Sequence, residues 1–287
     1  MNQKLKSADP RRVELVIISD VHLGTYGSQA RALEQYLRSV RPKTLILNGD
    51  IIDIWQFSKK YWPSSHMKII KRIFSFLSKK TDVYFIPGNH DEMLRKFVGT
   101  RLGRLKVQNK VVLNLREEKV WIFHGDAFDV TMQHSRWLAK LGAIGYDLLI
   151  LLNSAVNKVL QAAGKPRISF AGKIKKSVKK AVSYVNSFEE TVAQIAADQG
   201  FDTVVCGHIH QPADKLISVN NRQIRYLNSG DWIENLTALE YNEGYWSLYR
   251  HPFNEDDAEE KEPDPAELFS EMKEELLFSR NFVIKQI

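Results

Sequence analysis

The stretch VELVIISDVHLG, residues 13–24, joins an apolar run to a polar end, and this combination recurs along the chain. Valine and isoleucine dominate the run, which is typical of a strand that is buried on both faces. Comparable runs are TLILNGD (44–50), VYFIPGN (83–89), KVWIFHG (119–125) and TVVCGHIH (203–210). We therefore expect at least five strands, each with polar side chains at its carboxyl end.

Two segments between the early runs, residues 28–40 and 66–77, carry apolar residues at helical spacing. Strand–helix–strand alternation predicts an α/β fold with a largely parallel central sheet. Later, QIRYLNSGD, NLTALEY and GYWSLYR are typical of short strands separated by turns. We expect these three to form an antiparallel meander beside the first sheet, which gives two mixed sheets flanked by helices.

Residues 128–187 interrupt the strand series and are typical of helices, first apolar and then basic. We expect them to form an inserted cap on a core made of residues 10–127 and 188–252. The apolar part, residues 137–163, either folds back as a helical hairpin or forms an acyl-chain pocket or membrane-contacting surface. Residues 253–287 form an acidic tail, as a solvated helix or a disordered segment.

The net charge of +7 is unevenly distributed. Residues 255–275 hold eleven acidic residues and two lysines, whereas residues 165–180 hold seven lysines and arginines and no acid. The basic run predicts either a phosphate-bearing or anionic partner or simply a solvated helix face. It contains a single aromatic residue, Phe170, too few for base stacking along a strand, so a nucleic-acid partner is disfavoured.

Cys206 is the single cysteine, which excludes an internal disulfide and fits a reducing compartment. The first twelve residues contain no apolar signal-like run. We expect a cytoplasmic location. The sequence leaves the oligomeric state open.

Side chains that can bind metal ions stand at the ends of all five predicted strands. They are Asp20 and His22; Asp50 and Asp53; Asn89, His90 and Asp91; His124 and Asp126; and His208 and His210. The carboxyl ends of strands are where sites form in open α/β sheets, and residues i and i+2 point the same way. Glycines 49, 88, 125 and 207 let the backbone turn sharply beside the ions. Carboxylate, amide and imidazole ligands without thiolate favour Mn²⁺, Fe or Zn²⁺, and their number suits two ions.

The series D-x-H, G-D-x-x-D, G-N-H-D, H-G-D and G-H-x-H, in this order, resembles the calcineurin-like metallophosphoesterases. The resemblance covers roughly residues 13–250 apart from the cap. It implies one metal held by Asp20, His22, Asp50 and His210, and a second held by Asp50, Asn89, His124 and His208. It also implies two divalent ions, with Mn²⁺ first and Fe or Zn²⁺ as alternatives, and in-line attack of a bridging water on phosphorus.

In the same resemblance His90 is not a ligand but faces the substrate, stabilises the phosphoryl charge and protonates the leaving oxygen. Asp53 matches the carboxylate that orients this histidine. Asn89 and Asp126 are further candidates for substrate contact. Lys173, Lys176 and Lys180 share one predicted helical face and are candidates for head-group phosphate contacts.

The cap and the segment Gly230-Asp231-Trp232 resemble more narrowly the UDP-2,3-diacylglucosamine pyrophosphohydrolases of lipid A biosynthesis. The reaction implied yields UMP and a lipid 1-phosphate at the inner face of the cytoplasmic membrane, with the cap in peripheral contact. This chain has His90 where that group has arginine, and AFDVTMQ where that group has a Cys-Thr-Asp stretch.

Because a histidine can act as a general acid, His90 favours a general phosphomonoesterase or phosphodiesterase, including cyclic-nucleotide or nuclease activity. The predicted cap favours a lipid-linked substrate instead. A catalytically silent scaffold would be expected to have lost ligands, and here all seven are present.

Overall fold

The computed structural model describes residues 9–55, 61–128, 185 and 187–252. Lys173, Lys176 and Lys180, nearly all of the expected cap and the whole acidic tail lie outside the described residues. The expected division into core, cap and tail therefore stays a prediction.

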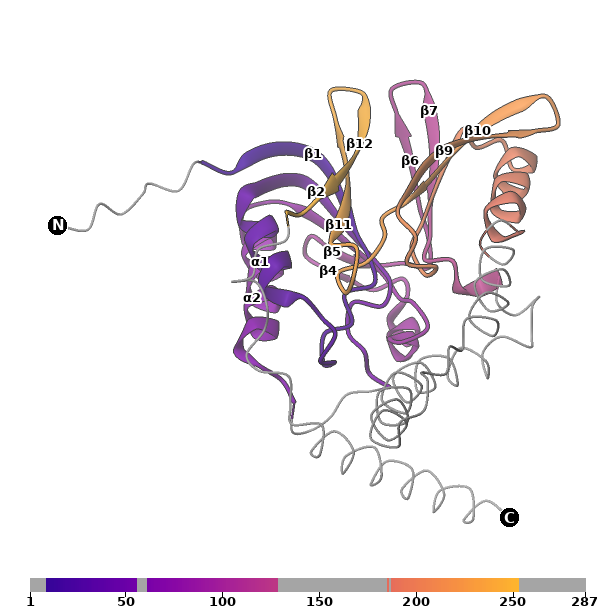
Figure 1. The fold of residues 1–287 in the computed structure, drawn as a ribbon. Coiled ribbons are helices and arrows are strands. Elements are labelled where there is room, and N and C mark those ends of the chain that lie inside the picture. Colours follow the sequence, from indigo (N-terminus) through magenta and orange to yellow (C-terminus); the bar gives the residue numbers. More distant parts are fainter. Residues whose placement is uncertain (1–8, 56–60, 129–184, 186, 253–287) are drawn as a thin grey trace, which may run out of the picture.

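Two mixed β-sheets form the centre of the molecule (Figure 1). The first contains, in spatial order, β12 (Tyr245–Arg250), β11 (Thr237–Asn242), β1 (Arg11–Ile18), β2 (Val40–Asn48), β3 (Asp82–Ile86), β5 (Leu105–Val107) and β4 (Arg101–Leu102). The second contains β6 (Val111–Leu115), β7 (Glu118–Ile122), β8 (Thr203–Cys206), β10 (Arg222–Asn228) and β9 (Ala213–Val219). β1, β2, β3 and β5 pair in parallel, as do β7, β8 and β10. The predicted fold class is confirmed.

Helices cover the outer faces of both sheets (Figure 1). α1 (Ala30–Ser39) and α2 (Ser64–Ser78) pack on the first sheet, close to the predicted helical ranges. A helix over residues 187–198 packs on the second sheet, and the short 3₁₀ helix η1 (Glu92–Phe97) follows β3. Within these described ranges, no helix is long and apolar enough to cross a membrane.

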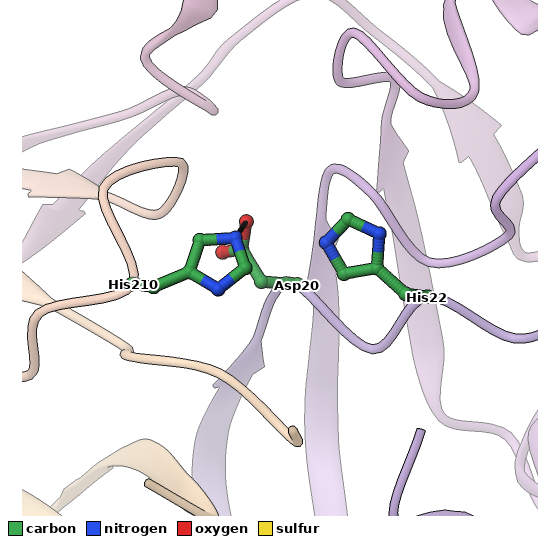
Figure 2. A group of neighbouring side chains, drawn as sticks. All are labelled: Asp20, His22 and His210. Carbon is green, nitrogen blue, oxygen red and sulfur yellow. Dashed lines mark ion pairs between the residues drawn. The ribbon is translucent and has the colours of Figure 1, made fainter. Parts of the chain in front are cut away.

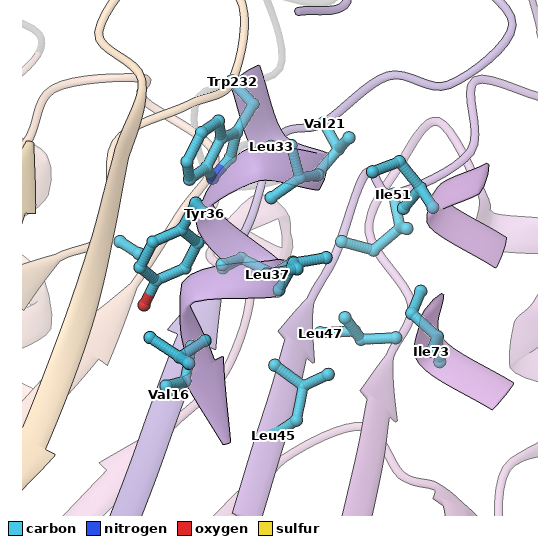
Figure 3. Close-up of a cluster of buried hydrophobic side chains, with 14 of the residues drawn as sticks. Val16, Val21, Leu33, Tyr36, Leu37, Leu45, Leu47, Ile51, Ile73 and Trp232 are labelled. Atoms are coloured by element: carbon cyan, nitrogen blue, oxygen red, sulfur yellow. The ribbon is translucent and has the colours of Figure 1, made fainter. Parts of the chain in front are cut away.

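The two faces of β1 explain why its last four residues, Leu15 to Ile18, are all apolar. Val16 and Ile18 pack against α1 and α2 in the cluster drawn in Figure 3. Leu15 and Ile17 point the other way, into the cluster between the two sheets. Because alternate side chains of a strand face opposite sides, a strand with a helix layer on one side and a sheet on the other is apolar at every position.

The last three predicted strands do not form one meander, so this part of the expectation is wrong. β10 pairs in parallel with β8 in the second sheet, whereas β11 and β12 extend the first sheet beside β1. The loop between β10 and β11 therefore crosses from one sheet to the other. Turn signals in the sequence show where strands end but not which neighbour they pair with.

The crossing loop is anchored by Trp232, which is fully buried. Its backbone N–H donates to the carbonyl of Asp20 (3.0 Å), and its carbonyl accepts from the N–H of Gln29 (2.8 Å). Its indole stacks on Tyr36, with 5.4 Å between ring centroids. The loop that joins the two sheets is thus fixed to the end of β1.

His66 links α2 to the loop after β1. Its Nδ1 accepts a hydrogen bond from the backbone N–H of Gly24 at 3.0 Å, and its fully buried ring packs edge-on against Trp62. Burial lowers the pKa of His66 to about 4, so the ring is neutral near pH 7. A neutral ring leaves Nδ1 free of a proton, as this hydrogen bond requires.

This histidine should make the free energy of unfolding depend on pH. Between its ordinary pKa of 6.5 and about 4, the unfolded chain binds a proton that the folded chain does not, so stability is lost as pH falls. His66→Asn keeps an acceptor but does not titrate. We expect urea denaturation to give a shallower decline across this window for the variant than for the wild type; parallel curves would contradict this role.

Candidate metal centre

Two carboxylates, Asp20 and Asp50, stand at the ends of neighbouring parallel strands. Each lies two residues beyond its strand, and they are 0% and 2% exposed. Three backbone hydrogen bonds join their loops: Asp20 N–H to the Gly49 carbonyl (3.1 Å), and the N–H groups of Val21 and His22 to the Asp50 carbonyl (2.9 Å each). The strand pairing thus continues into the loops and holds both carboxylates in place.

The backbone at the predicted ligands is strained. Non-glycine residues rarely adopt positive φ, and each such residue destabilises the fold by about 1–3 kcal/mol. Five of the seven predicted ligands have it: Asp20, His22 and Asp50 (52° each), His208 (67°) and His210 (53°). Strain of this kind persists where the surroundings enforce it, and it gathers at functional sites.

One group that could hold an ion consists of Asp20, His22 and His210, whose ligand atoms lie within 4.8 Å of one another. Figure 2 shows the His210 ring beside the Asp20 carboxylate, with His22 facing them from the other side. His210 Nε2 is 3.2 Å from Asp20 Oδ1. His210 follows β8 of the second sheet, so each sheet contributes to this group.

A second group consists of Asp50, His124 and His208, again within 4.8 Å of one another. His124 Nδ1 contacts the Asn48 carbonyl at 2.8 Å, which as a hydrogen bond places the proton on Nδ1. Its Nε2 lies 3.3 Å from Asp50 Oδ2. A backbone carbonyl that accepts the proton of one imidazole nitrogen, and so leaves the other nitrogen for a metal ion, is a usual arrangement of a metal-binding histidine.

Asn89 is held against Asp50 by its chain neighbours. The backbone N–H of His90 donates to Asp50 Oδ1 (2.8 Å), and a Cβ added at Gly88 would overlap the same oxygen.

Gly88 and Gly207 do not have positive φ, unlike Gly49 and Gly125. At 88 and 207 the reason for glycine is therefore close approach to the carboxylates rather than the expected sharp turn.

His90 and Asp53 form a third grouping with His22. Asp53 Oδ2 is 2.8 Å from His90 Nδ1 and 3.2 Å from His22 Nδ1, so a single oxygen faces two imidazoles. Asp53 thus faces both rings, through a hydrogen bond with His22 Nδ1 and an ion-pair contact with His90 Nδ1. The side chain of His90 is 26% exposed, and the half-exposed Trp55 lies 5.9 Å away between ring centroids.

The charges of the site are strongly coupled. Burial alone would raise the pKa of the carboxylates, but His210 lowers the pKa of Asp20, and His124 lowers that of Asp50. Burial alone would lower the pKa of the imidazoles, but Asp50 raises the pKa of His124 to about 10 and Asp20 raises that of His210 to about 9. Protons on the two imidazoles thus balance the two carboxylates, and a divalent cation would displace these protons.

The residues present fit divalent metal ions. Four atoms of the predicted ligands are buried and make no hydrogen bond of normal geometry within the described residues: Asp20 Oδ1, His22 Nε2, Asn89 Oδ1 and His124 Nε2. Buried polar atoms are normally paired, so a group of orphaned oxygen and nitrogen atoms at one place calls for an explanation. Each belongs to a ligand predicted from the sequence, and oxygen and imidazole ligands suit Mn²⁺, Fe or Zn²⁺.

Three residues near these groups were missed or only partly read in the sequence. Asp231 Oδ2 lies 3.7 Å from His210 Nδ1, and its Oδ1 accepts backbone N–H groups of its own loop. Asp91 accepts from the N–H groups of Gly88 (2.6 Å) and Ile51 (2.9 Å) and so joins two ligand-bearing loops. Arg95 had no motif to reveal it; its Nη2 donates to Asp126 Oδ2 at 2.5 Å.

Comparisons with known proteins show what this chain is similar to. The model of the calcineurin-like phosphoesterase family matches residues 13–212, more than half of the chain. The UDP-2,3-diacylglucosamine hydrolase of Aliivibrio fischeri (strain MJ11) is 24% identical over 83% of this chain and 99% of its own. The enzyme of that name from Stenotrophomonas maltophilia (strain K279a) is 27% identical over 81% and 96%. A solved phosphoesterase from E. coli covers 80% of this chain and 88% of its own, with 14% identity and a TM-score of 0.38.

Gly88→Ala should remove metal binding without unfolding the protein. The new methyl group would overlap Asp50 Oδ1 and lie 2.7 Å from both the Asp50 backbone nitrogen and His124 Cδ2, so both ligands must move. We expect the metal content after dialysis against Mn²⁺, measured by inductively coupled plasma mass spectrometry, to fall below half of the wild-type value. Gly27→Ala is the control, since its methyl group meets Ile233 at an ordinary 3.4 Å. Wild-type metal content in a folded Gly88→Ala variant would contradict the assignment.

Proposed function

The chain belongs to the calcineurin-like phosphoesterase family, and on that premise we propose that it hydrolyses the diphosphate of a nucleotide-linked lipid. It is a metal-dependent hydrolase. The substrate we propose is UDP-2,3-diacylglucosamine or a close relative, cleaved to UMP and a lipid 1-phosphate. Two ions, with Mn²⁺ as the proposed physiological metal, would be held by the seven strand-end ligands. Such a substrate would bring the protein to the inner face of the cytoplasmic membrane.

The main support for the proposal is the pair of ligand groups, one of which contains Asp20 and the other Asp50. Asp20, His22 and His210 would hold one ion, and His124, His208 and Asn89 the other, with Asp50 between them. When bound, such a pair supplies positive charge to the phosphoryl oxygens and lowers the pKa of the attacking water. The protein's part is to hold these ligands rigidly, through the paired loops and the strained backbone described above.

His90 would act on the leaving group. Burial alone would lower its pKa, but the hydrogen bond to Asp53 and the charge of Asp50 raise it. The contact with Asp53 engages Nδ1, so the opposite nitrogen of the ring is left to meet the substrate, and the raised pKa favours the protonated ring that can donate. In the reaction, a water oxygen would bond to phosphorus and lose one proton to solvent, the bond to the leaving oxygen would break, and that oxygen would take a proton from His90, which regains one from solvent.

The choice of substrate rests on relatives. Two proteins named UDP-2,3-diacylglucosamine hydrolase match about four-fifths of this chain and almost all of their own length. Binding of a lipid to the cap is part of the same proposal, although the cap lies outside the described residues.

A second candidate is a general phosphomonoesterase or phosphodiesterase, and His90 is the observation that favours it. A protonated imidazole helps most when the leaving group is a poor one such as an alkoxide, and least when it is a phosphate monoester. An acid fixed by Asp53 at the mouth of the site therefore suits alkyl esters as well as diphosphates.

Release of UMP from UDP-2,3-diacylglucosamine by the Mn²⁺-loaded protein tests the first candidate directly. We expect release at a higher kcat/KM than for alkyl or aryl phosphates. His90→Ala should reduce turnover of alkyl phosphates by about 10²–10⁴-fold, the usual size of general acid catalysis, and that of aryl phosphates much less. Failure to release UMP, with good turnover of simple phosphates, would favour the second candidate.

A further inference from the structure

Arg95 is a cation at the edge of the metal centre that neither the motifs nor the proposed mechanism uses. It lies on η1, five residues after His90. Its Nη2 donates to Asp126 Oδ2 at 2.5 Å. The Arg95 side chain is 36% exposed, whereas that of Asp126 is 12% exposed. A well-buried carboxylate thus fixes an arginine that still reaches solvent.

The anchor places Arg95 beside the second ligand group. Asp126 is two residues after His124, so their α-carbons are at most about 7.6 Å apart. The intervening Gly125 packs so tightly that a Cβ added there would lie 3.2 Å from His208 Cβ. The segment from His124 to Asp126 therefore lies against another predicted ligand, and the guanidinium bound to it borders the site.

The guanidinium is well suited to a phosphate. It has five N–H donors in a rigid fork, and its hydrogen bond to Asp126 is made by Nη2. Because Asp126 already holds the group in position, binding an anion through the remaining donors needs little further ordering. Arginine binds phosphate through two parallel hydrogen bonds, which lysine cannot reproduce.

We propose that Arg95 is a specificity-determining residue that binds the second phosphate of a diphosphate substrate, the one that is not attacked. This rests on the proposed function. The two metal ions would bind the attacked phosphate, and His90 would protonate the leaving oxygen. The remaining phosphate therefore needs a cation at the edge of the site. A phosphate monoester has no second phosphate, so Arg95 would favour diphosphates over monoesters.

Asp126 is the positioning residue in this scheme. Asp126→Asn keeps its size and removes the charge that holds the guanidinium. It should weaken selection for diphosphates less than loss of Arg95 itself, because a mobile arginine still attracts phosphate.

The test compares two kinds of substrate with the Mn²⁺-loaded full-length protein. We expect Arg95→Gln to lower kcat/KM for UDP-2,3-diacylglucosamine by about ten- to a hundred-fold, the size of one charge-assisted hydrogen bond, mainly through KM. Hydrolysis of p-nitrophenyl phosphate should change by less than about twofold. Arg104 lies in the loop between β4 and β5 and forms an exposed ion pair with Asp82. Arg104→Gln breaks this pair and should leave both activities unchanged. An equal loss on both substrates would overturn the proposal.

Calorimetric titration with UDP and UMP separates this proposal from the proposed function. In the wild type UDP should bind more tightly than UMP, and Arg95→Gln should remove most of that difference even if the lipid is not cleaved. A UDP-to-UMP ratio of dissociation constants that Arg95→Gln leaves unchanged would overturn the role of Arg95. Absence of UMP release by the wild type would instead overturn the proposed substrate.

Discussion

Asp20 and Asp50 lie side by side, out of contact with water, at the ends of two paired strands, and the site is arranged around the positive charge they require. Two neighbouring buried carboxylates destabilise a fold unless cations or hydrogen-bond donors compensate them. Imidazoles from the second sheet provide this compensation, with His210 beside Asp20 and His124 beside Asp50. The buried carboxylates of the first sheet therefore require side chains from the second sheet that can carry positive charge.

The backbone, rather than long side chains, holds the two carboxylates in place. Paired loops continue the ladder between β1 and β2, and the left-handed conformations at Asp20 and Asp50 turn both carboxylates inward. Glycine at positions 88 and 207 leaves room for these carboxylates, where any other residue would collide with them. Trp232 holds the connection between the sheets against Asp20, so the two halves of the centre stay aligned. Rigidity of this kind is what two metal ions and an in-line displacement require.

Much of the fold could be predicted from the sequence, because the spacing of apolar residues and the length of strands are local properties. The gathering of the strand ends could be predicted too, because the chemistry of Asp20, His22, Asp50 and His210 is visible residue by residue. The sheet assignment of β10 could not, since strand pairing depends on contacts distant in the chain. Arg95 and His66 were also beyond reach: each acts through a partner 31 or 42 positions away, and no motif marks such a pair. Asp231 lies in a segment that the sequence singles out, but its contact with His210 is not marked there. The metal ligands and their roles stay predictions, as does the cap.

We propose that the buried carboxylates and their imidazoles hold two metal ions with Asp50 between them. Anomalous diffraction from crystals of the Mn²⁺-loaded protein, recorded on both sides of the manganese absorption edge, tests this most directly. We expect two peaks about 3.5–4 Å apart, the usual separation in two-metal sites, with Asp50 contacting both. A single peak, or two peaks of which Asp50 contacts only one, would contradict it.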